Sequence, residues 1–437
     1  MTHNGEPPTS FEGKYSPDVM ASQALGYIDH AASHEEPFFI TVAPIAPHSN
    51  MRLRDPRRSD PPEYAKRHAH FFKEYKIPRT ASFNPDVPSG VSWVRDLPKL
   101  NDSVLEYHDE FQRSRLRALQ SVDEMVEDLV EYLRAKDLLD NTYIIYTSDN
   151  GFHISQHRLP PGKECPFEED INIPLIIRGP GVPAGHTAEL VSSHTDLAPT
   201  VLRLAGGERS DLDGLPIPLD REALSKPGFS EHVNVEFWGG VVLEGKYAPT
   251  LKDLLPTSNN TYKALRLVGK NYNLLYTVWC TGEREFYDVS RDPSQMHNYL
   301  DPAHNASSIN YELIHRPLKH VINRLDSLLM VTKSCKGREC HQPWSVLHPD
   351  GSVATLADAL EKTFDAFYEG QPRISFSSCV QGHIVSEEGP QDVNVWDSEE
   401  EGFSGHAGLA AGAQGSFLPG TARKASFVRF GRWSDWT

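Results

Sequence analysis

The spacing of hydrophobic and polar residues predicts a chain of alternating helices and strands. Apolar residues spaced three and four apart predict amphipathic helices over 17–32, with Ser16 as N-cap and Pro17 in first position, and over 114–137. Short β-branched and aromatic runs at 38–43, 143–147 and 175–178 predict buried strands. The first half of the chain is therefore expected to be an α/β structure.

The pattern changes after residue 230. Runs of strand type are closely spaced, at 233–238, 263–269, 272–280 and 285–288, which predicts a small antiparallel sheet. An amphipathic helix is predicted over 311–329. The acidic and then Gly- and Ala-rich chain from residue 387 on is expected to be disordered. We therefore divide the chain into an α/β part, a sheet-and-helix subdomain, a C-terminal extension and a tail, over 1–230, 231–332, 333–386 and 387–437.

Charge and hydropathy exclude several classes of protein. The chain has 437 residues, with 43 Lys and Arg against 60 Asp and Glu, a net charge of −17. Such a charge argues against nucleic-acid binding. No apolar run approaches the roughly 18 residues of a membrane helix, so no membrane partner is expected. The first 30 residues lack the basic start and apolar middle of a signal peptide.

Five cysteines and three sequons bear on the compartment. Cys335 and Cys340 are close enough to form a disulfide, which requires an oxidising compartment. The sequence leaves the pairing of the other three open: Cys165, Cys280 and Cys379. If the chain is secreted, the N-x-Ser/Thr sequons are candidate glycosylation sites: Asn101, Asn259 and Asn305.

Polar residues with the chemistry of an anion and metal site follow two of the predicted strands. Asp149 and Asn150 offer neighbouring oxygen donors after strand 143–147, and such oxygens suit Ca²⁺ or Mg²⁺. Lys163 adds a cation for an anionic ester, and His48 follows strand 38–43. A bare Asp-Asn-Gly is more often only a turn, so the wider context has to decide.

That context resembles the second half of a sulfatase. The residues are Ser-Asp149-Asn150-Gly, a following His and Lys163, and then Pro-Phe-Glu-x-Asp-Ile-x-Ile-Pro-Leu-Ile-Ile-Arg-Gly-Pro-Gly. The chain is most similar to fungal arylsulfatases and N-acetylglucosamine-6-sulfatases. The resemblance implies an α/β fold, a partial alkaline-phosphatase-like α/β/α sandwich with a smaller C-terminal antiparallel-sheet subdomain. Residues 1–230 would be the C-terminal part of the catalytic domain.

The same resemblance implies roles for individual residues. Asp149 and Asn150 would bind the active-site calcium. Lys163 and His48 would contact the sulfate ester and serve catalysis, and we expect His153 and His157 to bind substrate.

The family's nucleophile is a formylglycine made from the Cys or Ser of Cys/Ser-x-Pro-x-Arg, and that motif is absent from this sequence. We therefore expect the formylglycine in the missing N-terminal part of the family fold, and we expect this chain alone to be inactive. The function implied is arylsulfatase-type hydrolysis of a small sulfate ester of an aryl group or a sugar. A secreted or lysosome- or vacuole-like location is implied as well.

Two alternatives stay open: a phosphodiesterase or phosphonate hydrolase of the same superfamily, and an inactive truncated sulfatase remnant. The sequence identifies neither the ester nor the oligomeric state.

Overall fold

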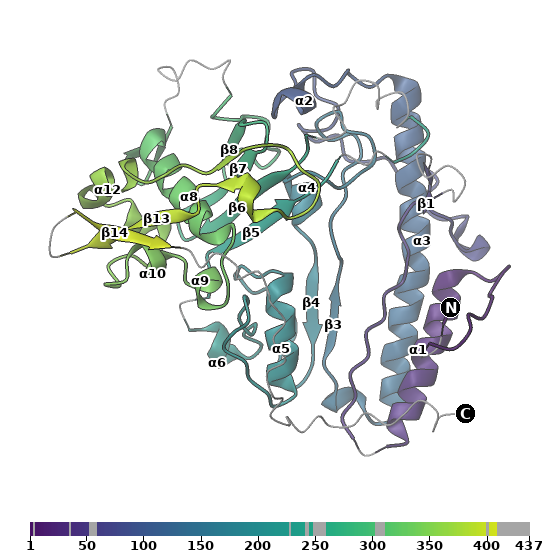
Figure 1. The fold of residues 1–437 in the computed structure, drawn as a ribbon. Coiled ribbons are helices and arrows are strands. Elements are labelled where there is room, and N and C mark those ends of the chain that lie inside the picture. Colours follow the sequence, from purple (N-terminus) through teal and green to yellow (C-terminus); the bar gives the residue numbers. More distant parts are fainter. Residues whose placement is uncertain are drawn as a thin grey trace.

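The computed structural model describes residues 1–2, 5–34, 36–51, 59–226, 229–240, 244–247, 259–301, 311–398 and 402–408. Two long helices lie on one side, a pair of strands crosses the middle, and the C-terminal sheet with its helices lies on the other side (Figure 1). Shorter elements connect these parts: β1 (Asn50–Met51), β2 (Ser59–Asp60), α2 (Ser92–Arg95), α4 (Glu168–Ile171), α5 (Leu197–Leu204) and α6 (Arg221–Leu224).

The two long helices are α1 (Ser16–Ala32) and α3 (Asp102–Ala135), which pack side by side (Figure 1). Both predicted helices are confirmed, but both start earlier than expected. The N-cap of α1 is Tyr15 and makes no side-chain bond, so Ser16 is already helical. α3 begins near residue 102 rather than 114, because the Asn101 side chain accepts the Val104 N–H at 3.1 Å and caps it.

The strand predicted at 38–43 is wrong. These residues form no β-ladder in the structure. Phe38 and Ile40 do pack with the buried side chains of Ile28 and Leu133, so the apolar run is used for packing on the helices. Hydrophobicity indicated contact with the core, whereas a strand also requires a hydrogen-bonded neighbour.

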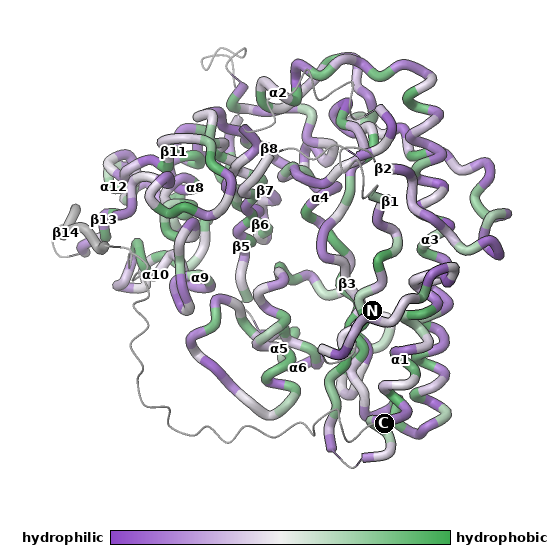
Figure 2. Tube along the Cα trace, turned by 45° about the vertical axis from the view of Figure 1, so that its right-hand side comes forward, coloured by the Kyte–Doolittle hydropathy of each residue, from purple (hydrophilic) through white to green (hydrophobic). Residues whose placement is uncertain are grey.

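The strands in the middle of the molecule are β3 (Ile144–Thr147) and β4 (Leu175–Arg178), which confirms both predicted strands. The prediction that they are buried is wrong, because every residue of β3 is only partly buried and β4 has exposed positions. They form an antiparallel pair, and Thr147 lies opposite Leu175. Side chains of β4 alternate between partly buried and exposed, and Ile176 is 62% exposed. Figure 2 shows hydrophobic and hydrophilic positions alternating along the surrounding helices, as expected for amphipathic elements.

The predicted C-terminal sheet is confirmed. Its four strands are antiparallel neighbours in chain order: β5 (His232–Phe237), β6 (Tyr262–Gly269), β7 (Tyr272–Trp279) and β8 (Arg284–Asp288). Helix α8 (Leu318–Thr332) packs near it. This helix starts later than the predicted residue 311, because a small hairpin comes first, formed by β9 (Glu312–Leu313) and β10 (Arg316–Pro317).

The C-terminal extension is built from short elements: α9 (Arg338–His341), α10 (Trp344–Leu347), α11 (Leu356–Ala359), α12 (Asp365–Glu369) and β11 (Ser375–Phe376). The prediction of a disordered tail from 387 is wrong at its start, where three further strands form: β12 (Glu388–Gly389), β13 (Asp392–Asp397) and β14 (Gly402–Gly408). Val393 and Trp396 of β13 belong to the core, and this burial offsets the cost of ordering an acidic segment. Residues from 409 on lie outside the described part of the chain.

One hydrophobic cluster joins the sheet to the extension. It contains Leu274 of the sheet, Leu328 of α8, and Leu347 and Tyr368 of the extension, all fully buried. We call this cluster the C-terminal core. Its continuity means that the segments divided at residue 332 share one packed interior.

Two disulfides are formed. The predicted Cys335–Cys340 bond is confirmed, and Cys280 at the end of β7 is bonded to Cys379 of the extension. Cys165 is a buried free thiol. Among the described helices, none has the length and apolar character needed to cross a membrane.

We predict that Leu328→Ala lowers the free energy of unfolding by about 3 kcal/mol, because a buried leucine leaves both lost transfer energy and a cavity. Urea unfolding followed by fluorescence and circular dichroism measures it. The control is Lys319→Ala on the exposed face of α8, which removes an ion pair with Glu369 and should cost about 0–1 kcal/mol. Equal effects of the two variants would contradict the C-terminal core as the stabilising unit.

Candidate functional site

β3 delivers the first polar residues of the site. It ends at Thr147, and the chain continues through Asp149 and Asn150 into a long segment, called loop 151–171, which ends in the short helix α4 and leads back to β4. The two ends of this loop are hydrogen-bonded: Gly151 N–H donates to Asp170 O at 2.8 Å, and Phe152 N–H donates to Glu169 O at 2.7 Å. A Cβ on Gly151 would lie 2.0 Å from Glu169 O, so this close approach requires glycine.

Asp149 and Asn150 have oxygen atoms available for a cation. The exposed Asp149 accepts only local bonds, among them the Asn150 N–H at 3.0 Å. The amide nitrogen of Asn150 donates to Gly151 O at 2.7 Å, which leaves its oxygen as the ligand atom. The donors fit Ca²⁺ in kind, but they supply only part of the six to eight oxygens that it takes.

Lys163 lines the same cavity as Asp149 and Asn150. The cavity has a volume of about 1500 Å³, and its wall includes Asp149, Asn150 and Lys163. Acidic side chains also contribute to it: Glu164, Glu168 and Asp170. Within the described part of the chain, no carboxylate pairs with the Lys163 ammonium group, so this cation remains available for an anionic ligand.

His48 reaches the region through a different loop. Its Nδ1–H donates to Ser49 O at 2.9 Å, which leaves Nε2 for other partners. Arg115 of α3 connects the two loops: its guanidinium donates to Pro47 O at 3.4 Å and lies 3.9 Å over the Phe152 ring. His48 is not among the residues that line the cavity.

Arg115 was missed as a site residue by sequence reasoning. It belongs to the arginine cluster at 113, 115 and 117, which in the sequence was interpreted as the start of the predicted helix 114–137. A signal was available in the sequence, since a charged residue stands close to the apolar stripe of α3. Only the packing shows that it contacts the loops of His48 and Asp149.

His153 is held inside the protein by Asp170. Its Nδ1–H donates to the Asp170 carboxylate at 2.8 Å, and both side chains are buried. Burial lowers the pKa of His153, but the charge and hydrogen bond of Asp170 outweigh it and the net pKa is raised. The Asp170 carboxylate also accepts the Cys165 N–H at 2.9 Å, so it fixes both halves of the loop.

His157 is a core residue in this structure. It is 1% exposed and stacks on Phe167 with ring centroids 3.9 Å apart. Within the described part of the chain, neither ring nitrogen has a hydrogen-bond partner. Burial, with a smaller contribution from His153, lowers its pKa to about 3. Neither His153 nor His157 lines the cavity, so substrate binding by them stays a prediction.

The sequons differ in accessibility. Asn101 is exposed at the start of α3, and Asn259 is partly buried. Asn305 lies outside the described residues.

Comparison with known proteins gives one family. The family model described as Sulfatase matches residues 2–207. The chain is 39% identical over 392 residues to the sulfatase ppz1 of Metarhizium majus, covering 89% of this chain and 82% of that protein. It is 34% identical to an arylsulfatase of Volvox carteri, and 31% identical to the N-acetylglucosamine-6-sulfatase of Capra hircus. These alignments cover 87% and 83% of this chain but only 60% of either relative.

Solved structures support the fold. BT4656, solved with its substrate D-glucosamine-2-N,6-O-disulfate, aligns with a TM-score of 0.53 and 21% identity, over 67% of this chain and 68% of that one. A putative sulfatase, yidJ, from Bacteroides fragilis aligns with a TM-score of 0.52 and 22% identity, over 74% of this chain and 60% of that one. The predicted alkaline-phosphatase-like fold with a C-terminal antiparallel sheet is therefore confirmed.

We predict that His157 makes the protein less stable in acid. Its pKa is about 3 when folded and roughly 6.5 when unfolded, so the unfolded state binds the extra proton between these values. The free energy of unfolding therefore keeps its full value above about pH 6.5, and it falls by up to about 1.4 kcal/mol per pH unit below that. His157→Leu should show a correspondingly smaller loss between pH 6.5 and 4.5 in urea unfolding. His70→Leu, at an exposed histidine, is the control, and parallel curves for wild type and His157→Leu would contradict a buried neutral imidazole.

Proposed function

Because this chain belongs to the sulfatase family, we propose that the protein hydrolyses sulfate monoesters of a small organic molecule. The observation that carries this proposal is the shared cavity of Asp149, Asn150 and Lys163. There an oxygen pair for a cation occurs together with an ammonium group that no carboxylate of the described residues pairs with. A sulfate ester is an anion whose oxygens can be bound by both kinds of group. The chain spans 60% of the length of the arylsulfatase of Volvox carteri, so the activity proposed is that of the whole protein.

Lys163 binds the sulfate group in this proposal, and Asp149 and Asn150 hold calcium beside it. The acidic residues in the cavity wall would repel a bare sulfate ester, so positive charge has to outweigh them. When bound, calcium supplies a divalent charge that stabilises the ester oxygens. The remaining calcium ligands have to come from groups other than these two residues.

His48 serves the proton transfers and contacts the sulfate. Its Nδ1–H is already engaged with Ser49 O, which fixes the ring and leaves Nε2 for the reaction. Arg115 acts as a positioning residue, because it touches both the backbone before His48 and the ring of Phe152.

The nucleophile is proposed to be a formylglycine supplied by a part of the protein outside residues 1–437. No Cys/Ser-x-Pro-x-Arg motif occurs in this sequence. Of the five cysteines, four are in disulfides and Cys165 is buried, so none is placed to serve instead. Residues 1–437 alone would accordingly be inactive.

The organic part of the substrate would lie against the apolar side of the cavity. Leu175, Val235 and Phe237 belong to its wall, together with Asp149. Both an aryl ring and a sugar ring present apolar faces to such a wall. Relatives named arylsulfatase and N-acetylglucosamine-6-sulfatase are consistent with either class.

An oxidising compartment, secreted or lysosome- or vacuole-like, is proposed for the protein. Two of its disulfides support this, since such bonds persist outside the cytosol. Relatives named extracellular sulfatases point the same way.

We predict that Lys163→Ala in the full-length protein lowers kcat/KM for an aryl sulfate at least about 100-fold, because it removes a charge that faces the reacting ester. Asp149→Ala should abolish both turnover and calcium binding, measured by calorimetry. The control is Lys270→Ala, at an exposed lysine, which should keep wild-type rates. An equal or higher rate on a phosphonate monoester than on the sulfate would contradict the sulfatase proposal.

Peptide mapping of the native protein is expected to find a formylglycine in a peptide outside residues 1–437. The same digest should contain the linked pairs Cys280–Cys379 and Cys335–Cys340, Cys165 as a thiol, and glycan on Asn101. A native chain that begins at Met1 and lacks formylglycine would overturn the enzymatic proposal. Free thiols at Cys280, Cys335, Cys340 and Cys379 would overturn the proposal of an oxidising compartment.

A further inference from the structure

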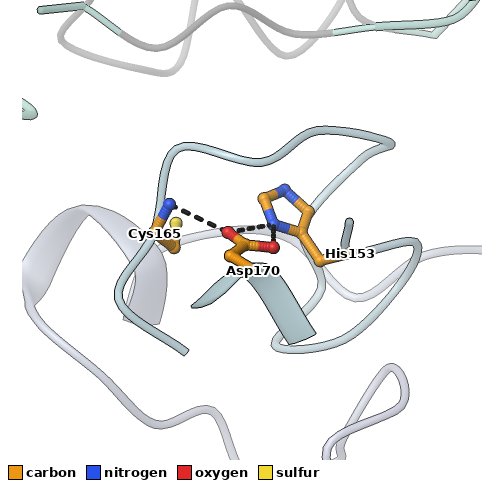
Figure 3. A group of neighbouring side chains, drawn as sticks. All are labelled: His153, Cys165 and Asp170. Carbon is orange, nitrogen blue, oxygen red and sulfur yellow. Dashed lines mark hydrogen bonds and ion pairs between the residues drawn. The ribbon is translucent and has the colours of Figure 1, made fainter. Parts of the chain in front are cut away.

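Three buried side chains of loop 151–171 come together at a point that the proposed reaction does not use. His153, Cys165 and Asp170 each bring one possible ligand atom, and these atoms all lie within 4.8 Å of one another. The Asp170 carboxylate lies between the thiol and the imidazole (Figure 3). None of the three side chains is more than 3% exposed.

The surroundings of this cluster carry an excess of buried negative charge. Glu164 and Glu244 are 8% and 4% exposed, and Glu244 Oε2 has no hydrogen-bond partner among the residues that the structure describes. Burial, with smaller contributions from the charges of Asp170 and Glu244, raises the pKa of Glu164 to about 7. The positive charge of His153 lowers the pKa of Glu164, and Arg115 is a cation that interacts electrostatically with Glu244. A buried unpaired carboxylate is costly, so the cluster would be stabilised by a bound cation.

We propose that His153, Cys165 and Asp170 bind a zinc ion, with Glu164 or water in the fourth position. Sulfur, nitrogen and carboxylate oxygen are the three donor types that zinc takes in proteins. Tetrahedral zinc places its ligand atoms roughly 3.5 Å apart, which small side-chain movements reach from the present arrangement. This inference is independent of the proposed sulfatase activity.

The protons balance in a defined way. Burial holds the pKa of the Cys165 thiol well above its usual range, so without a cation the sulfur carries its proton. Zinc binding displaces that proton and leaves a thiolate. The ring nitrogen of His153 that binds zinc must also be unprotonated, so the ion replaces a proton that the imidazole now shares with Asp170.

An ion can reach the cluster from the cavity, since Cys165, Asp170 and Glu164 contribute to its wall. The same cavity then contains two donor sets of different chemistry. Asp149 and Asn150 offer only hard oxygens and suit calcium, whereas the thiol and imidazole select a borderline ion such as zinc. Zinc would cross-link both halves of loop 151–171 and thereby fix the segment that carries Lys163.

Zinc content and cobalt spectroscopy test this proposal. The full-length protein, purified without chelator and dialysed, should contain about one zinc per chain by inductively coupled plasma mass spectrometry. Cys165→Ser and His153→Gln should weaken zinc binding by more than about tenfold, since loss of a group that only hydrogen-bonds to a metal ligand already costs about 10–100-fold. Asp149→Ala should keep its zinc while losing calcium. Cobalt exchanged into the wild type should give a thiolate-to-cobalt charge-transfer band that Cys165→Ser lacks.

Ile154→Val is the matched control, because it changes a buried neighbour in the same loop without removing a ligand. Melting curves in excess EDTA show whether each variant is folded. Equal zinc in wild type and Cys165→Ser would overturn the proposal, because the metal would then be bound by groups other than this thiol. A folded wild type that takes up no zinc, or zinc that is lost with Asp149→Ala, would overturn it as well.

Discussion

The buried carboxylate of Asp170 is the constraint on which the site depends. The carboxylate accepts hydrogen bonds from the His153 ring and the Cys165 backbone N–H. The backbone carbonyl of Asp170 accepts the Gly151 N–H. One residue therefore ties the start of loop 151–171 to its end. Asn150 directly precedes this loop and Lys163 lies within it. The closure therefore constrains how the proposed calcium ligands and the proposed sulfate-binding cation are placed in the cavity that they share.

Long elements carry the loops to the same place. α3 spans residues 102–135, and its Arg115 touches the segments that hold His48 and Phe152. On the other side, β5 supplies Val235 and Phe237 to the cavity wall, and the C-terminal core makes that sheet a firm support. The cavity thus has a wall built from distant parts of the chain, which contribute both polar and apolar residues.

Local patterns predicted those elements whose formation depends on their own residues. α1 and α3 were readable from their helical period, because each buries one face. β6, β7 and β8 are buried at nearly every position, and they were readable as short apolar runs close together in the sequence. Residues 38–43 show the limit of such reading, since an apolar run identifies core contact but not a partner strand. The strands after 388 show the converse, because Val393 and Trp396 find a core that no local pattern reveals.

Of the site, the sequence by itself determined the identity and order of the chemical groups: Asp149 and Asn150 after a strand, Lys163 in the next loop, and His48 before them. It also determined that Cys335 and Cys340 could bond, because their separation is short. Only the tertiary structure decided that Cys280 pairs with Cys379 and that His157 is a neutral core residue. The cluster of His153, Cys165 and Asp170 was decided in the same way. The physical reason is that contacts between residues distant in sequence, and the burial that shifts a pKa, arise only when the chain is packed.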